Sequence, residues 1–252
     1  MDELLLISGN DIPFIQAGIV IHQPSLKEIA FIGEENFYMG CELLKFSKDI
    51  LLEQDKILLG NKTNFEIIMS IMNENNSDDK NHEIQVGKES INMIFMLLFP
   101  RYEYTIQTNS IDFFQEEQLV GSINEDNFED FKEILNIIFC LTFQQEEGQE
   151  FNPANEQARR IAEKLKKGRQ RAAEAKGERV KVNILSKYVS ILAVGEHKDI
   201  NTLLEYTIYQ IRDEYERFLL KQNFDYTFKA RLAGAKDLQD GKYWMDDIHD
   251  DI

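Results

Sequence analysis

The chain has 252 residues, of which 43% are hydrophobic and 11% aromatic. This composition supports an ordinary buried core and is too rich in aromatic residues for a disordered chain. The longest strongly apolar run, residues 91–99, is about half the roughly 20 residues that a membrane helix needs. The acidic start, Met1-Asp2-Glu3, lacks the basic segment of a secretory signal. We therefore expect a soluble cytoplasmic protein, with Cys41 and Cys140 as buried free thiols.

The net charge of −17 is distributed unevenly along the chain. Residues 1–150 contain 9 Lys and Arg against 28 Asp and Glu, a net charge of −19. Residues 151–252 contain 19 Lys and Arg against 17 Asp and Glu, a net charge of +2. Within that second part, residues 153–181 hold ten basic and four acidic residues, a net charge of +6. The chain is electrostatically divided into an acidic and a weakly basic part.

Along the acidic part, the first elements have clear local signals. Residues 12–23 are rich in Ile and Val and predict an extended segment. Ser25 and Glu28 have the spacing of a capping box, in which the hydroxyl and the carboxylate satisfy free backbone amides at a helix start. Thr63 and Glu66 repeat this signal. We expect a helix after each of these two motifs.

The strongest sequence signals for β-strands come after an apolar helix. An apolar helix from about residue 89 to residue 99 should end at Pro100, which cannot continue it. Alternating apolar and polar residues over 102–106 predict a strand, and 111–113 and 119–123 predict two more, which together form an antiparallel meander.

The acidic part closes with a helix and a polar segment. Asp126 has the position of an N-cap for a helix that extends to about Ile138. Residues 144–149 are polar and include a glycine, so we place a domain boundary there. The expected fold is α+β, with an N-terminal α+β domain over residues 1–147 and a C-terminal helical domain over residues 150–252.

The second part is expected to be almost entirely helical. A basic helix begins at Asn152-Pro153, a second helix spans about 184–194, and Asp199 should cap a third. A final short helix is expected near residues 224–233. Apolar residues of the third helix recur at spacings of four and three, which predicts a seam packed on the second helix. The seam consists of Leu204, Ile208, Ile211, Tyr215 and Phe218.

Motifs for catalysis are missing from the sequence. The four histidines lie far apart, and none has a metal-ligand partner three or four residues away. Gly87-Lys88 lacks the earlier glycine and the following Ser or Thr of a phosphate loop. We therefore expect no enzyme, no catalytic or metal-binding residues and no cofactor.

The candidate partner-binding residues are mostly basic. The basic helix has three interpretations: a solvated surface with internal Glu–Lys pairs, a docking surface for an acidic partner such as the acidic half of another copy, and a nucleic-acid-binding helix. Nucleic acid is the least favoured, because no aromatic residues interleave the basic ones for base stacking. The candidate residues are Arg159, Arg160, Lys164, Lys166, Lys167, Arg169, Arg171 and the single tryptophan, Trp244.

Four segments of the C-terminal part resemble a family of tailed-bacteriophage proteins. They are residues 151–169, which begin Phe-Asn-Pro-Ala-Asn-Glu-Gln-Ala-Arg-Arg, residues 184–195, residues 203–220 and residues 230–237. The resemblance implies a protein of the tail-morphogenesis region of phage genomes, where tail assembly chaperones and baseplate components are encoded. It gives no residue a chemical role.

These observations lead to one expected function and one alternative. We expect a phage tail-morphogenesis protein that acts by protein–protein binding, as a chaperone-like assembly factor or as a tail or baseplate subunit. Its expected partners are other phage tail proteins and a second copy of the chain, with no membrane contact. It would work in the host cytoplasm during assembly or within the virion tail. The alternative is a nucleic-acid-binding packaging or regulatory protein that uses the basic helix in residues 153–181.

Overall fold

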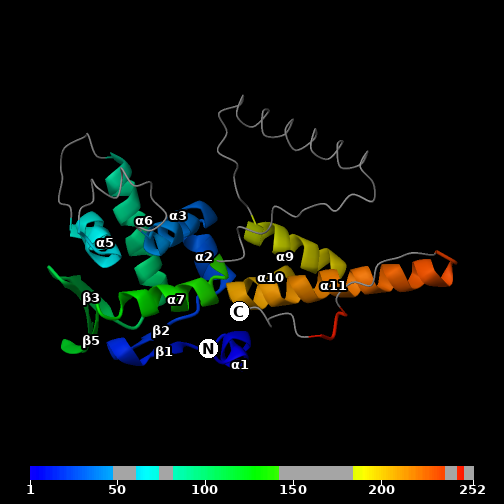
Figure 1. The fold of residues 1–252 in the computed structure, drawn as a ribbon, viewed down its shortest axis with the longest axis horizontal. Coiled ribbons are helices and arrows are strands. Elements are labelled where there is room, and N and C mark those ends of the chain that lie inside the picture. Colours follow the sequence, from blue (N-terminus) through cyan, green and yellow to red (C-terminus); the bar gives the residue numbers. More distant parts are fainter. Residues whose placement is uncertain (48–60, 74–81, 142–183, 236–242, 247–252) are drawn as a thin grey trace.

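A computed structural model of the chain describes residues 1–47, 61–73, 82–141, 184–235 and 243–246. These residues form two small antiparallel sheets and a set of helices, which confirms the expected α+β class (Figure 1). The elements are α1 (Glu3–Ser8), β1 (Ile12–Phe14), the 3-10 turn η1 (Ile15–Ala17), β2 (Ile19–Ile21), α2 (Leu26–Ile32), α3 (Glu34–Lys45), α5 (Asn64–Asn73), α6 (His82–Leu98), β3 (Glu103–Ile106), β4 (Ser110–Gln115), β5 (Gln118–Asn124), α7 (Phe128–Ile138), α9 (Ile184–Gly195), α10 (Ile200–Leu204) and α11 (Ile208–Leu232).

The extended segment predicted over residues 12–23 is a hairpin. β1 and β2 pair antiparallel, with Ile12 opposite Ile21, and η1 makes the connection. Gly18 ends η1 with a φ of +72°, a conformation that side chains with a Cβ rarely adopt. A Cβ at this position would lie 2.8 Å from the carbonyl oxygen of Val120, so the turn can lie directly against β5.

Both capping boxes are confirmed, and the next helix is longer than predicted. The Ser25 hydroxyl accepts from the Glu28 amide at 3.3 Å, and the Glu28 carboxylate accepts from the Ser25 amide at 2.8 Å. Thr63 and Glu66 make the same reciprocal pair before α5. α6 begins at His82, seven residues before the predicted start, and ends directly before Phe99-Pro100 as expected.

The predicted meander is also confirmed: β3, β4 and β5 form one antiparallel sheet in this order. The turn between β4 and β5 consists of Glu116 and Glu117, whose φ angles are +50° and +64°. Two-residue hairpin turns of this kind favour Asn and Gly, since positive φ is costly for residues with larger side chains. A β-bulge follows, because the pairing shifts between Phe113 and Phe114.

The predicted cap of the next helix is wrong by one residue. α7 begins at Phe128 after Asn127, and neither Asp126 nor Asn127 caps it with a side chain. The Asn127 side chain instead accepts from the Asn124 amide at 2.9 Å and donates to the Ser122 carbonyl at 3.0 Å. The residue at the helix start therefore holds the turn after β5.

A cluster of phenylalanines forms the centre of the core between the sheet and helices α6 and α7. The ring of Phe99 lies 4.5 Å from that of Phe113 and 6.0 Å from that of Phe131. All three rings are buried. Cys41 and Cys140 are also buried and form no disulfide, as expected.

The C-terminal helices differ from the prediction in where they break. Asp199 does cap a helix, since its carboxylate accepts from the Asn201 amide at 2.8 Å, but that helix, α10, has only five residues. A new capping box at Thr207 starts α11, which continues for 25 residues. The predicted separate helix near residues 224–233 is thus the second half of α11.

The C-terminal helices pack directly on the N-terminal elements. The Leu26 amide donates to the Tyr206 carbonyl at 2.8 Å, and the Leu185 amide donates to the Glu34 carboxylate at 2.9 Å. Buried residues from Leu6 to Ile211 belong to one connected core. The proposed boundary between residues 147 and 150 lies outside the described residues, so the division into two domains stays a prediction.

Candidate functional site

α11 has two halves with different surroundings. In the proximal half, residues 208–218, Ile208, Tyr209 and Ile211 are buried and the rest are partly buried. In the distal half, residues 219–232, no residue is buried. The distal half extends past the end of α9 (Figure 1). The same helix therefore contributes to the core at one end and to the surface at the other.

Polar contacts fix the start of α11 to the N-terminal elements. Thr207 and Gln210 form the capping box, with the Thr207 amide 2.8 Å from the Gln210 side-chain oxygen. The Gln210 side chain also donates to the Ile7 carbonyl at 2.7 Å. One turn later, Arg212 donates to the Cys140 carbonyl at 3.2 Å and to Glu216 at 2.7 Å. α11 is therefore held by α1 and by the residues that follow α7.

The proximal half packs on α9 through the predicted seam. The rings of Tyr188 and Tyr215 stack with their centroids 4.2 Å apart. At the end of α9, Gly195 lies against Phe218, since a Cβ on Gly195 would be 2.4 Å from the ring. The predicted packing of this seam on helix 184–194 is confirmed at these two positions. The glycine allows the close approach of the two helices.

Charged side chains lie beside this interface. The Lys198 ammonium contacts the Glu214 carboxylate, lies 3.6 Å from Glu196 and sits over the ring of Tyr206 at 5.5 Å. The second Glu214 oxygen is buried and has no hydrogen-bond partner among the described residues. Lys198 thus bridges the two carboxylates, an arrangement typical of an ion-pair network at a helix interface.

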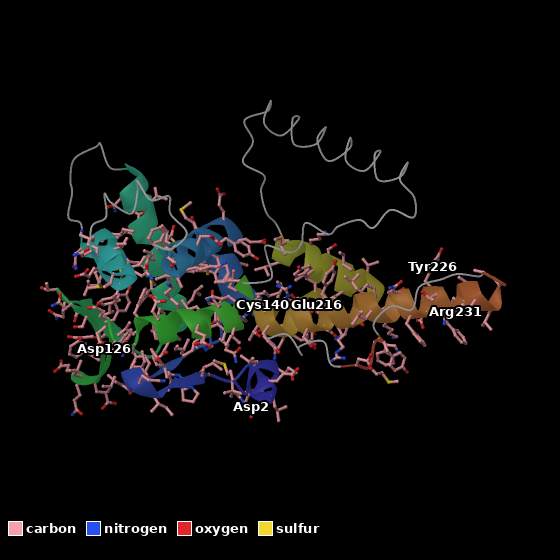
Figure 2. The ribbon with its side chains drawn as sticks, in the orientation of Figure 1. Asp2, Asp126, Cys140, Glu216, Tyr226 and Arg231 are labelled. Atoms are coloured by element: carbon pink, nitrogen blue, oxygen red, sulfur yellow. The ribbon has the colours of Figure 1, made fainter. Side chains whose placement is uncertain are left out.

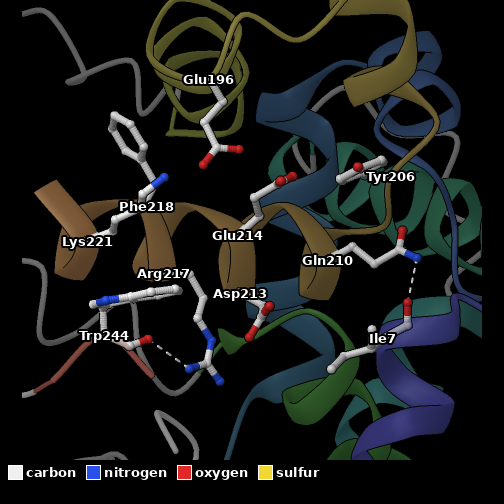
Figure 3. Close-up of a pocket in the computed structure, with 10 residues that line it drawn as sticks. All are labelled: Ile7, Glu196, Tyr206, Gln210, Asp213, Glu214, Arg217, Phe218, Lys221 and Trp244. Atoms are coloured by element: carbon white, nitrogen blue, oxygen red, sulfur yellow. Dashed lines mark hydrogen bonds between the residues drawn. The ribbon is translucent and has the colours of Figure 1, made fainter. Parts of the chain in front are cut away.

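A groove of about 550 Å³ runs along the same side of α11 (Figure 3). Arg217 fixes the C-terminal residues at the groove, since its guanidinium donates to the Trp244 carbonyl at 3.2 Å and to the Asp246 carbonyl at 2.7 Å. The residues that line the groove are Ile7, Glu196, Tyr206, Gln210, Asp213, Glu214, Arg217, Phe218, Lys221 and Trp244.

The distal half of α11 presents an apolar stripe, which we define as Phe224, Phe228 and Leu232. A spacing of four places the three side chains along one face of the helix. The rings of Phe224 and Phe228 stack at 6.3 Å, and Phe228 and Leu232 are 54% and 73% exposed. The stripe lies on the half of α11 that extends past the end of α9, where no residue is buried. The stripe is therefore free of the core.

Basic residues flank the stripe. Residues 219–235 contain Lys221, Lys229 and Arg231 against the single acidic residue Asp225, a net charge of +2. Among the described residues of the C-terminal end, Tyr243 covers the near end of the stripe, with its ring 5.2 Å from that of Phe224. Aromatic residues and Arg, both present on this surface, are enriched in protein interfaces.

Only one of the eight residues predicted to bind a partner lies in the described part of the chain. Trp244 lies on the groove, partly buried and held by Arg217. The other seven, which are Arg159, Arg160, Lys164, Lys166, Lys167, Arg169 and Arg171, lie outside the described residues. The sequence prediction missed the apolar stripe, although its spacing of four is visible in the sequence.

The described residues offer no group of three or more His, Cys, Asp or Glu side chains that could hold a metal ion. Burial raises the pKa of the Cys140 thiol to about 12 and raises that of Cys41 as well, so neither is a ready nucleophile. Among the described helices, none has the length and apolar character to cross a membrane.

Comparison with known proteins links the C-terminal part to phage. Residues 176–249 match the model of the YomV second domain, which indicates a relation to a phage-derived protein family. The match covers less than a third of the chain and includes α9, α10 and α11. Searches of the curated proteins and of the solved structures find no match.

Proposed function

We propose that the protein is a bacteriophage tail-morphogenesis protein that acts by binding other proteins and catalyses no reaction. It would work as a chaperone-like assembly factor in the host cytoplasm or as a tail or baseplate subunit. The distal half of α11 carries the proposal, because it combines an exposed apolar stripe with basic flanks and continues from a firmly packed helix. The match of residues 176–249 to a phage-derived family supports the phage origin.

The geometry around α11 favours binding over chemistry. Two carboxylates of the groove, those of Glu196 and Glu214, face Lys198 in a structural ion-pair network, and no histidine is among the described residues that line the groove. An anchored helix that presents aromatic side chains loses little conformational freedom when a partner binds, which favours affinity. We expect the partners to be other phage tail proteins.

Affinity purification from infected cells, with mass spectrometry of the co-purified proteins and of purified particles, tests the proposal. We expect tail proteins to co-purify with the wild-type chain and to be lost in the variant Phe228→Ser with Leu232→Ser. The control is Phe31→Ser, which changes a side chain that is 93% exposed and lies elsewhere, on α2. Detection in lysate alone indicates an assembly factor, and stoichiometric detection in particles indicates a subunit. Recovery without any tail protein would contradict the proposal.

The alternative function is nucleic-acid binding in packaging or regulation. The net charge of +6 over residues 153–181 favours it, because basic residues release counterions when they contact phosphates. The charge of −19 over residues 1–150 opposes it. Retention on DNA that falls steeply with salt would favour the alternative, whereas no retention at low salt would exclude it.

A further inference from the structure

The acidic part of the molecule has exposed apolar side chains of its own, on η1 and at the start of β5. We define the η1–β5 patch as Ile15, Leu119 and Val120 together with Glu116 and Glu117. Ile15 is 84% and Leu119 is 60% exposed, and the two glutamates form the turn directly before β5. The close approach of Gly18 to the Val120 carbonyl joins η1 to β5. Residues 115–126 contain four acidic residues and no basic one.

The backbone of the β4–β5 turn is strained. Glu116 and Glu117 both adopt positive φ, where glycine or asparagine would be less strained. Strained residues of this kind are often found at binding sites, where their side chains are needed. The pair places two carboxylates at the exposed tip of the β4–β5 hairpin.

The two apolar surfaces lie at opposite ends of the molecule. In Figure 1 the β4–β5 sheet and the distal end of α11 occupy the two ends of the longest axis. Figure 2 labels Asp126 near one end and Arg231 near the other. One molecule therefore cannot bring its own two surfaces together, but two molecules can.

We propose that the protein associates with itself head to tail: the distal half of α11 docks on the η1–β5 patch of a second copy. Both surfaces combine exposed apolar side chains with charge, and their charges are opposite. Contact between two α11 ends would place basic residues against basic residues, and contact between two patches would place glutamate against glutamate. Only the head-to-tail arrangement pairs unlike charges.

This arrangement leaves a free surface at each end of a dimer. Because the contact is heterologous, further copies can add until the chain of molecules closes into a ring or continues as a filament. The inference rests on the proposed function in one respect, since both assign the distal half of α11 to protein binding.

Sedimentation velocity of the purified full-length protein at rising concentrations tests the inference. We expect the average mass to rise from the monomer mass of 29.5 kDa past that of a dimer, and to fall when salt is added. Variant A, Phe228→Ser with Leu232→Ser, and variant B, Ile15→Ser with Leu119→Ser, should each be monomeric when alone. An equimolar mixture of A and B retains one intact contact, so it should form a dimer of twice the monomer mass and no larger species.

A charge exchange is the second test. Lys229→Glu with Arg231→Glu in one protein, and Glu116→Lys with Glu117→Lys in another, should each abolish association at low salt. Mixing the two restores unlike charges at both contacts and should restore association beyond a dimer. Phe31→Ser should associate as the wild type does, and melting curves check that every variant is folded.

Two results would overturn the inference. A wild-type protein that stays monomeric at all concentrations excludes self-association. If variant B alone formed dimers, and mixing it with variant A did not raise the average mass, the contact would be a symmetric one between two α11 ends. Either result leaves the proposed function standing, since that function is tested by the phage proteins that co-purify.

Discussion

The two halves of α11 differ in what their apolar residues do, although both halves are regular helix. In the proximal half, Ile211 is buried and Tyr215 stacks on Tyr188 of α9. In the distal half, Phe228 and Leu232 face solvent. Apolar periodicity alone therefore predicts the helix but does not separate a core face from a binding face. The difference arises from α9, which ends at Gly195 and leaves the distal half uncovered.

The largest expected loss of stability follows from truncating a buried side chain in the proximal half of α11. Ile211→Ala should lower the free energy of unfolding by about 2–5 kcal/mol, because the side chain is fully buried and its removal leaves a cavity. The matched control on the same helix is Leu232→Ala, which should change it by less than about 0.5 kcal/mol. Urea unfolding of both variants gives the comparison. Equal losses would mean that the distal half also belongs to the core.

A smaller loss in the free energy of unfolding is expected for a substitution at Gly195, where α9 ends. Gly195→Ala adds a methyl group 2.4 Å from the Phe218 ring, and overpacking of this kind costs about 1–3 kcal/mol. Combining it with Phe218→Ala should cost less than the sum of the two single changes, because the clash is removed. A strictly additive pair in urea unfolding would refute the close contact.

Loss of the cap that begins the proximal half should lower the free energy of unfolding by less than the change at Gly195. Thr207→Ala removes the acceptor for the Gln210 amide and should cost about 1 kcal/mol. Thr202→Ala, on the neighbouring short helix and outside any cap position, is the control for loss of a hydroxyl. If thermal unfolding ranks the control as the more damaging change, the start of α11 is misplaced.

The smallest change in stability is expected for Arg217, near the end of the proximal half of α11. Arg217→Ala removes the donor to the Trp244 and Asp246 carbonyls and should leave stability almost unchanged. Trp244 is the only tryptophan, so its emission should shift to longer wavelength as the indole becomes more exposed. Lys221→Ala, also on the groove, should cause no shift. An unchanged emission spectrum in Arg217→Ala would contradict the anchoring role.

Local signals predicted much of the fold. Reciprocal capping at Ser25 and Thr63, the meander and the seam on α9 all depend on residues close in sequence or on simple periodicity, so they could be predicted. The break between α10 and α11 could not, because the seam spacing continues across it and hides the cap at Thr207. Asp126 failed as a cap because Asn127 takes that position and bonds backward to the turn.

The candidate site was less predictable than the fold. Trp244 stood out as the single tryptophan, but its anchor Arg217 is 27 residues away in sequence. The apolar stripe was visible as a spacing of four, yet its exposure depends on where α9 ends. The Glu116-Glu117 turn has no sequence signature, since the common two-residue turns contain Asn or Gly. The acidic character of residues 1–150, by contrast, was evident from the sequence and enters the head-to-tail proposal through Glu116 and Glu117.

The most direct test of the division of α11 is the paired melting curve and sedimentation profile of the variant Phe228→Ser with Leu232→Ser. We predict a melting temperature close to that of the wild type together with a mass that stays at 29.5 kDa at every concentration. A melting temperature lowered as far as that of Ile211→Ala, with wild-type association retained, would contradict it.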